Sequence, residues 1–428
     1  MPPVKLMDQG VIREDIVAVL TANSRLPGSS YGDLMGQINS LDLGVRRMDD
    51  LLDDYGQDTV RDVFAELKER SSRQMRSLIG DLDDGVYSTE EFLDNDGIED
   101  EPLKIALDLT IDGGTLTFDF SRSADACAGP MNISETTAIA ATYVALKHVF
   151  RDVPANGGVL EPITFIIPDG KILSAVAPRP VGGYTETILR LIDIVFSTFA
   201  KVDPEIAPAN GYGTINAVSV NGRRPGEARP WVFFTFFGGG LGGHSDGDGL
   251  THGNAAISMA TIPPAEILEA ALPIMFSQWA VRPDSAGPGR NRGGLGSIYE
   301  IELLEERGTG FVFAERGRFP PRGSAGGGDA ALDVVSYEQD DGRHIPEMTS
   351  KAVDIRLRKG NRIRIESPGG GGYGPAVERD PELVAEDVRL GFVSRENAGA
   401  QYGVVIADDG SVDPAATQAA RSAMGAAE

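Results

Sequence analysis

Residues 103–120, LKIALDLTIDGGTLTFDF, are the stretch in which the periodicity of this chain changes. Apolar and polar side chains alternate on both sides of a turn at residues 112–114, which is typical of two strands joined as a β-hairpin. The alternating apolar residues are Ile105, Leu107, Leu109, Ile111, Leu116, Phe118 and Phe120. We therefore expect a β-hairpin at this point of the chain.

The residues before the hairpin have helical periodicity instead. Apolar side chains recur three or four positions apart, and Gly80 is placed to end the second helical pattern. Two more helices are predicted after the hairpin, at residues 134–150 and 185–200, where each segment has one apolar face. The N-terminal helical positions are Ile12, Ile16, Val19, Leu20, Val60, Val63, Phe64 and Leu67.

Short β-rich runs separated by glycine-rich turns fill residues 212–367. Asp380 followed by Pro381 then predicts the N-cap and first turn of a C-terminal helix. Strands and helices lack the regular alternation of a parallel α/β protein, so the predicted fold class is α+β. The expected domains are a mainly helical region (1–100), an α+β domain (101–211), a β-rich glycine-loop domain (212–379) and a helical C-terminal segment (380–428).

Composition excludes several classes of function. The formal charge of −25 opposes binding to nucleic acid or to an anionic membrane. The apolar run at residues 231–237 is far too short to span a bilayer, and no signal segment follows Met1. A single cysteine, Cys127, allows no internal disulfide, which fits a reducing compartment. We expect a cytoplasmic protein with no nucleic-acid or membrane partner.

The first candidate site follows the glycine-rich run at residues 238–243. His244, Asp246 and His252 lie just beyond it, together with Asp248. Imidazole and carboxylate groups transfer protons, and glycine lets a ligand approach the backbone, so these three residues are the catalytic candidates. The spacing of the histidines matches neither a zinc enzyme nor a calcium loop, so no metal site is predicted. The alternative is a solvated, glycine-stabilised loop.

The second candidate site is the loop at residues 282–296, which places three arginines among glycines in an otherwise acidic chain. Guanidinium groups and free amides suit a phosphate or carboxylate. In the alternative interpretation, the arginines pair with nearby carboxylates and brace the loop. The candidate substrate-binding residues are Arg282, Asp284, Arg290 and Arg292.

Residues 367–374, SPGGGGYG, form a third glycine-rich run. The run contains no lysine and no following Ser or Thr on a helix, so it is not a phosphate-binding loop of the Walker type. No serine stands in a nucleophile-elbow sequence either. Nucleotide binding and serine hydrolysis therefore have no support in this chain.

Taken together, these loops resemble the hydantoinase B and 5-oxoprolinase family. The resemblance includes residues 284–296, residues 367–375 and the ERDP sequence at 378–381, and it preserves the order of the motifs along essentially the whole chain. Further similar segments are residues 94–97 (DNDG), 119–121 (DFS), 129–132 (GPMN), 154–158 (PANGG) and 402–405 (YGVV).

The resemblance implies a B-type subunit of a hetero-oligomeric, ATP-dependent enzyme. An A-type, ATPase-like partner would bind ATP and Mg²⁺ and phosphorylate a cyclic amide or an enolised ketone. The B-type subunit would then process this small molecule, by hydrolysis in hydantoinases, oxoprolinases and lactamases or by carboxylation in acetone and acetophenone carboxylases. A non-catalytic scaffold subunit is the third interpretation. In each case we expect little activity from the chain alone.

The chain departs from the family pattern at its N-terminus. The family's internal Pro-Pro-x-Lys-Leu segment stands here at residues 2–6, directly after Met1. The resemblance places a His and Asp metal site before that segment, so the divalent metal is expected on a separate N-terminal region or another chain. A split gene, a degenerate scaffold and a truncated chain are the three explanations, and we favour the first.

Overall fold

The computed structural model describes residues 3–224, 226–227, 230–258 and 261–425, which leaves Pro2 of the N-terminal segment outside the described residues. The chain forms two compact units, residues 1–70 with 223–230 and residues 71–222 with 231–428. In the first unit, a short antiparallel pair of strands precedes three helices, the last of which continues into the second unit. These elements are β1 (Met7–Asp8), β2 (Val11–Ile12), α1 (Glu14–Ala22), α2 (Pro27–Tyr55) and α3 (Gln57–Gly80).

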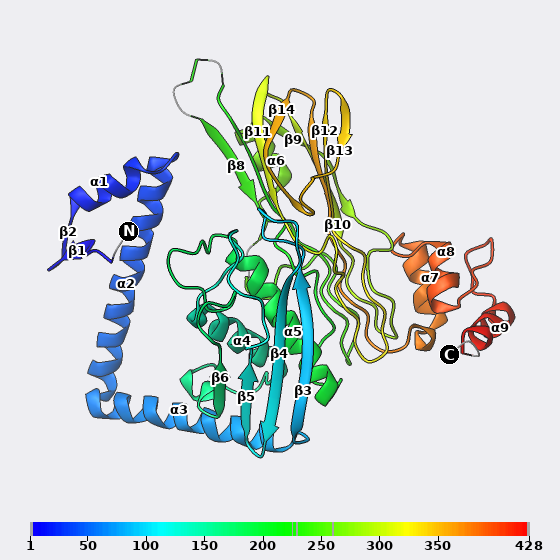
Figure 1. The fold of residues 1–428 in the computed structure, drawn as a ribbon, viewed down its shortest axis with the longest axis horizontal. Helices are drawn as coiled ribbons and strands as arrows, with labels where there is room; N and C mark the ends of the chain where they lie inside the picture. The colour runs from blue at the N-terminus through cyan, green and yellow to red at the C-terminus, as the bar shows by residue number, and fades with distance from the viewer. Residues whose placement is uncertain (1–2, 225, 228–229, 259–260, 426–428) are drawn as a thin grey trace. The chain divides into compact units, whose positions relative to one another are not determined.

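The second unit begins with a four-stranded sheet in the order β3-β4-β5-β6. The predicted hairpin is confirmed: β4 and β5 pair antiparallel, and their inward-facing side chains, from Ile105 to Phe118, are buried. Helices α4 and α5 pack together, and α5 contacts β3 and β4 (Figure 1). The elements are β3 (Gly85–Leu93), β4 (Leu103–Asp112), β5 (Thr115–Asp119), α4 (Glu135–Val149), β6 (Ile163–Ile166) and α5 (Tyr184–Val202).

Two further sheets of the second unit share one hydrophobic core. Val218 and Phe233 from the four-stranded sheet β14-β11-β7-β8 join Ile301 and Ile363 from the five-stranded sheet β13-β12-β15-β10-β9. The elements are β7 (Ala217–Gly222), β8 (Trp231–Thr235), α6 (Ala265–Ala271), β9 (Ile274–Val281), β10 (Ser297–Leu303), β11 (Arg307–Phe313), β12 (Val334–Gln339), β13 (Gly342–His344), β14 (Lys351–Arg358) and β15 (Arg362–Glu366).

Glycine-rich segments pack directly against one another and form what we call the glycine layer. Backbone hydrogen bonds join them, for example from Gly243 N to Gly371 O at 2.9 Å and from Gly370 N to Gly294 O at 3.0 Å. A Cβ atom on Gly293 would lie 1.8 Å from Gly370 O, so only glycine allows this approach. The layer comprises residues 238–249, 287–296, 323–328 and 369–374.

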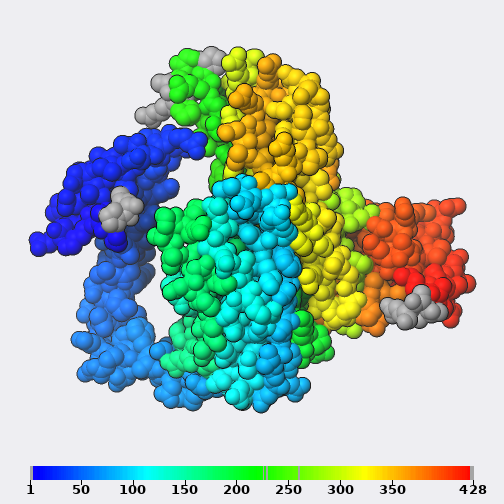
Figure 2. Space-filling model, viewed as in Figure 1, coloured from blue at the N-terminus to red at the C-terminus, as the bar shows by residue number. Residues whose placement is uncertain are grey.

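A helical segment follows the glycine layer and forms a small core of its own around Val384 and Tyr402. Asp380 caps α7 through the backbone N–H of Glu382, which confirms the helix predicted from this Asp-Pro pair. Figure 2 shows these C-terminal helices in orange and red beside the yellow, glycine-rich part of the second unit. The elements of this segment are η2 (Ala376–Glu378), α7 (Pro381–Arg389), α8 (Arg395–Tyr402) and α9 (Pro414–Gly425), and a further short 3-10 helix, η1 (Gly157–Leu160), lies between α4 and β6.

The predicted α+β class is confirmed, because the described residues combine helices with sheets that are mainly antiparallel and lack a regular alternation of strand and helix. Three strands lie inside the range 1–100 that the sequence assigns mainly to helices, namely β1, β2 and β3. Ile12, which was expected in a helix, ends β2, and the first helix begins at Glu14. No helix among the described residues is long and apolar enough to cross a membrane.

Candidate functional site

A cavity of about 540 Å³ lies between α5 and the part of the glycine layer that follows Gly240. Apolar side chains of α5, including Leu189 and Phe196, form one wall, and residues 241–251 form another. We call it the histidine cavity, because both His148 of α4 and His244 line it. Its other polar lining residues include Arg151, Asp193, Tyr212, Ser245, Asp246 and Asp248.

The structure brings only part of the predicted catalytic set to this cavity. His244 and Asp246 line it, and Asp246 lies 3.8 Å from Arg151. His252 is not among the lining residues. Its Nε2 instead accepts a hydrogen bond from Trp279 Nε1 at 3.2 Å and contacts the Tyr299 hydroxyl, in a cluster of aromatic rings. These contacts suit a histidine that supports packing.

Two of the predicted substrate-binding residues hold other segments in place. Arg282 donates to the backbone carbonyls of Leu332 and Glu366, each at 2.8 Å. Asp284 has a positive φ of 57° and accepts from the backbone N–H of Ser394 at 2.8 Å. Both residues therefore connect the loop to neighbouring backbone, and neither lines the histidine cavity.

The other two candidates face the C-terminal helices. Arg292 is largely buried and donates from Nε to Asp387 of α7 at 3.0 Å. Arg290 is 47% exposed and lies 3.6 Å from Glu378. Neither lines the histidine cavity, so the described contacts of all four residues match the bracing alternative.

Helix α5 carries charges that the sequence interpretation, centred on the loops, overlooked. Glu186, Arg190 and Asp193 recur at helical spacing within an apolar helix, and all three are buried. The signal was present in the sequence, because charged residues four and three positions apart share one helix face. Asp193 also lines the histidine cavity, so this face connects the cavity with the interior.

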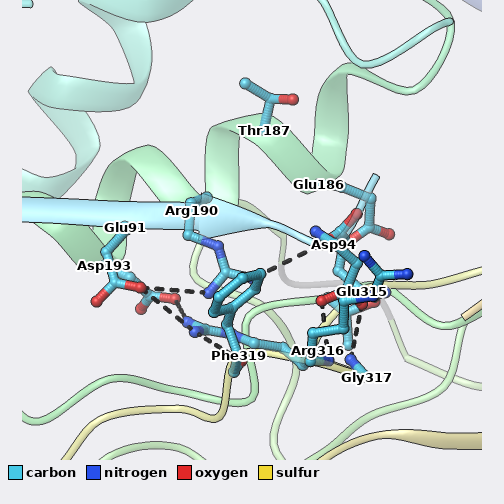
Figure 3. A network of polar contacts seen from close by, with 12 residues as sticks. Glu91, Asp94, Glu186, Thr187, Arg190, Asp193, Glu315, Arg316, Gly317 and Phe319 are labelled. Atoms are coloured by element: carbon cyan, nitrogen blue, oxygen red, sulfur yellow. Dashed lines mark hydrogen bonds and ion pairs between the residues drawn. The ribbon is translucent and has the colours of Figure 1, made fainter. Parts of the chain in front are cut away.

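The α5 charges belong to a buried network that is drawn in Figure 3. The Arg190 guanidinium lies 3.9 Å from Glu91 and 3.8 Å from Glu315, and no described residue accepts a hydrogen bond from it. Arg316 contacts the Asp193 carboxylate, and Lys351 contacts Glu315. Such groups persist in an interior only when opposite charges offset their desolvation.

Burial shifts the proton affinity of these carboxyl groups. Desolvation raises the pKa of Asp193 to about 7, against the attraction of Arg190. Desolvation and the negative charge of Glu315 raise the pKa of Glu186 to about 8. Carboxyl groups with pKa values near neutrality are uncommon and cluster at functional sites, although ion-pair networks produce them too. Asp193 is the one of these two that reaches the cavity.

The two cavity histidines present complementary ring nitrogens. His148 Nδ1 lies 2.9 Å from the carbonyl oxygen of Val144, so a neutral ring keeps its proton on Nδ1 and offers the Nε2 lone pair. His244 Nδ1 accepts the backbone N–H of Asp246 at 3.3 Å, so its neutral ring carries the proton on Nε2. One ring can therefore accept a proton while the other donates one.

A second cavity, of about 590 Å³, is lined mainly by apolar residues such as Phe313 and Met348. It contains no predicted site residue, and its one lysine, Lys351, is already paired with buried Glu315. No group of three or more His, Cys, Asp or Glu residues in the described part of the chain is arranged to hold a metal ion. The His, Cys, Asp and Glu side chains of the described residues therefore do not form a ligand set that fits a bound metal ion, and no step of the chemistry below uses a metal.

The raised pKa of Glu186 gives a testable pH dependence. Folding takes up a proton between the ordinary pKa of 4.5 and the folded value of about 8, so stability falls as pH rises through this window. Glu186→Gln keeps an uncharged acceptor for the Ile215 N–H and should remove that loss. Its stability advantage in urea denaturation should grow by up to about 1.4 kcal/mol per pH unit and level off above pH 8. An advantage that does not change with pH, or that also occurs for the exposed Glu306→Gln, would contradict the assignment.

Comparison with known proteins extends over nearly the whole chain. The sequence model of the family "Hydantoinase B/oxoprolinase" matches residues 1–376. A protein of Pseudomonas sp. strain NS671, named as the B-type subunit of a D-/L-hydantoinase, is 30% identical over 422 residues, which is 96% of this chain and 71% of that protein.

Two solved structures have a fold similar to that of this chain. The crystal structure of the ATP-dependent caprolactamase from Pseudomonas jessenii superimposes with a TM-score of 0.88 at 28% identity, covering 99% of this chain and 74% of that chain. A nucleotide-free acetone carboxylase, with a TM-score of 0.85 at 18% identity, covers 99% of this chain and 63% of that chain. The second likeness is one of fold alone.

Proposed function

Because the chain belongs to the hydantoinase B/oxoprolinase family, we propose that it is the B-type subunit of an ATP-dependent enzyme that hydrolyses a cyclic amide. Its substrate class would be a hydantoin, an oxoproline or another lactam. One observation supports this function most strongly: His148 and His244, whose Nδ1 contacts leave one ring able to accept a proton and the other able to donate one, line a single, mainly apolar cavity. A volume of about 540 Å³ is in the usual range for small-molecule sites.

The chemistry follows from the chain's own residues. Once the amide oxygen carries a phosphoryl group, a first water adds to the amide carbon and the ring C–N bond breaks, which leaves an amine and an acyl phosphate. A second water then hydrolyses the acyl phosphate to the carboxylate and free phosphate. His148 Nε2 would accept a proton from the attacking water, and the Nε2–H of His244 would protonate the departing ring nitrogen. Asp193, held by Arg316, lines the same cavity, and its negative charge would stabilise the imidazolium that forms.

The phosphoryl donor requires a second subunit in this scheme. The chain has no glycine-rich loop with a following lysine to cradle phosphates, so we assign ATP and Mg²⁺ to an A-type, ATPase-like partner. A divalent metal, if the enzyme uses one, would come from an N-terminal B-type region or another chain. The complex would be cytoplasmic, where ATP is available.

The purified chain is therefore expected to release no phosphate from ATP above the buffer blank in a phosphate-release assay. Adding the A-type partner, but not an unrelated protein, should restore ATP hydrolysis that depends on substrate. ATP hydrolysis by the chain alone that is abolished by a substitution within this chain would contradict the assignment of the nucleotide to the partner.

The substrate class is tested on the reconstituted complex. Lactams, hydantoins and oxoproline are screened for ATP-dependent ring opening, and ketones with bicarbonate are screened in parallel. Ring opening is the expected result. ATP-dependent carboxylation of a ketone without ring opening would replace the proposed function with the carboxylase alternative.

A further inference from the structure

Helix α2 (Pro27–Tyr55) is 29 residues long, and none of its residues is buried. Several of its large apolar side chains are strongly exposed, among them Leu41 at 71%, Val45 at 61% and Tyr55 at 62%. It also contains four glycines, which weaken a helix, and α1 contacts it without burying any of its residues. Such a helix needs a packing partner to be stable in water.

Eight large apolar residues of α2 follow a seven-residue repeat without interruption. Their spacing alternates between three and four positions, which is the a and d pattern of a coiled coil and places these eight along one seam. Met35, Leu43 and Leu51 lie outside the seam. The a positions are Tyr31, Ile38, Val45 and Leu52, and the d positions are Leu34, Leu41, Met48 and Tyr55. At 1.5 Å per residue the seam is roughly 37 Å long.

The residue types along the seam indicate the partner. In parallel coiled coils, β-branched residues at a, here Ile38 and Val45, combined with Leu at d, here Leu34 and Leu41, favour two strands over three or four. We propose that α2 forms a parallel, two-stranded coiled coil with the α2 helix of a second copy of this chain. The contact is independent of the catalytic function proposed above.

The charges beside the seam agree with parallel pairing. In a parallel pair, each e position faces the preceding g position of the other helix, so Asp42 would face Gln37 and Asp49 would face Gly44. No like charges meet in that register. In an antiparallel pair with aligned ends, Asp42 would face Asp42 of the other copy, which is unfavourable. The remaining acids of α2, Asp33, Asp50, Asp53 and Asp54, are at the b, c and f positions, outside the seam.

The experiment uses the full chain in light scattering coupled to gel filtration over a concentration series. We expect a species of twice 45.4 kDa. Leu41→Asp, at a d position, should shift the dissociation constant at least tenfold toward monomer. Leu43→Asp is the matched control, because Leu43 is also exposed, at 49%, but lies outside the seam. Neither change removes a buried side chain, so the thermal unfolding of the β-rich unit should not change.

Orientation is tested by cross-linking in a Cys127→Ser background. Leu34→Cys should form a disulfide-linked dimer on oxidation, because identical d positions meet only in the parallel pair. Cross-linking only between Leu34→Cys and Leu52→Cys chains would show antiparallel pairing and overturn the proposal. The proposal would also be overturned if the protein were a monomer at every concentration, or if Leu41→Asp and Leu43→Asp had equal effects. It would fail as well if the protein itself stayed monomeric and Leu41→Asp displaced a different bound chain.

Discussion

Replacing either His148 or His244 with glutamine is expected to lower the turnover of the reconstituted enzyme by about 100-fold or more, since each ring is assigned one proton transfer. Glutamine keeps a hydrogen-bonding side chain of similar length but cannot exchange a proton. The partner's ATP hydrolysis should persist, so phosphate release without ring opening is the specific signature. Ring opening and phosphate release are measured on the same samples.

The two remaining histidines provide the matched controls. His344 is paired with Asp341 and does not line the histidine cavity, so His344→Gln should leave turnover unchanged. His252→Gln should lower the thermal stability of the chain more than its turnover, because His252 Nε2 bonds to Trp279 within the aromatic cluster. A loss of turnover for His252→Gln at unchanged stability would return His252 to the catalytic set.

The turnover of the histidine variants also distinguishes a catalytic subunit from a non-catalytic scaffold subunit. If neither His148→Gln nor His244→Gln changes the coupled turnover, the cavity takes no part in catalysis and the chain serves as a scaffold. If only one variant is impaired, the pH profile of turnover identifies the proton transfer that was lost, because removing a base abolishes the acidic limb and removing an acid abolishes the basic limb.

Helices and strands could be predicted from the sequence where residues close together in the chain determine them. The hairpin of β4 and β5 followed from strict alternation, and α5, predicted at residues 185–200, spans Tyr184–Val202. Strand β3 was missed because its sequence, GVYSTEEFL, contains acidic residues, one of which, Glu91, is buried only because it has cationic partners. Those partners lie far away in the sequence.

The candidate site could be predicted only in part for the same reason. His244 and Asp246 are close in sequence to a recognisable glycine run, whereas His148 and Asp193 reach the cavity from α4 and α5. A lone histidine near the end of a helix carries no signal of its own. The face of α5 formed by Glu186, Arg190 and Asp193 was the one available sign of a buried polar site.

The glycine-rich motifs identified the family, but their sequence allowed two physical roles. They could form loops that admit a ligand or loops that only fix the backbone, and in the structure backbone from four segments fills the space beside these glycines. Arg282 and Arg292 likewise bind carbonyls and carboxylates of neighbouring segments. A strong sequence motif can therefore reflect close packing between distant segments as well as chemistry.

Gly293→Ala is expected to destabilise the chain by about 3 kcal/mol or more, because the new methyl group would lie 1.8 Å from Gly370 O and 2.4 Å from Gly370 C. Both contacts are with backbone, which cannot rotate away as a side chain can. Gly399→Ala in α8 is the matched control, since nothing lies within 4 Å of its Cβ position. Alanine there should be neutral, or stabilising by up to about 1 kcal/mol, because it is the better helix former.

Urea denaturation of the two variants, together with turnover of their complexes, distinguishes packing from ligand approach as the reason for the glycine at position 293. If packing is the reason, Gly293→Ala loses stability, and whatever fraction still folds at low temperature retains its turnover per folded molecule. If ligand approach is the reason, the variant remains as stable as Gly399→Ala but loses turnover. That second result would show that the glycine layer opens enough to admit substrate, and it would restore the ligand-binding role first predicted for the loop.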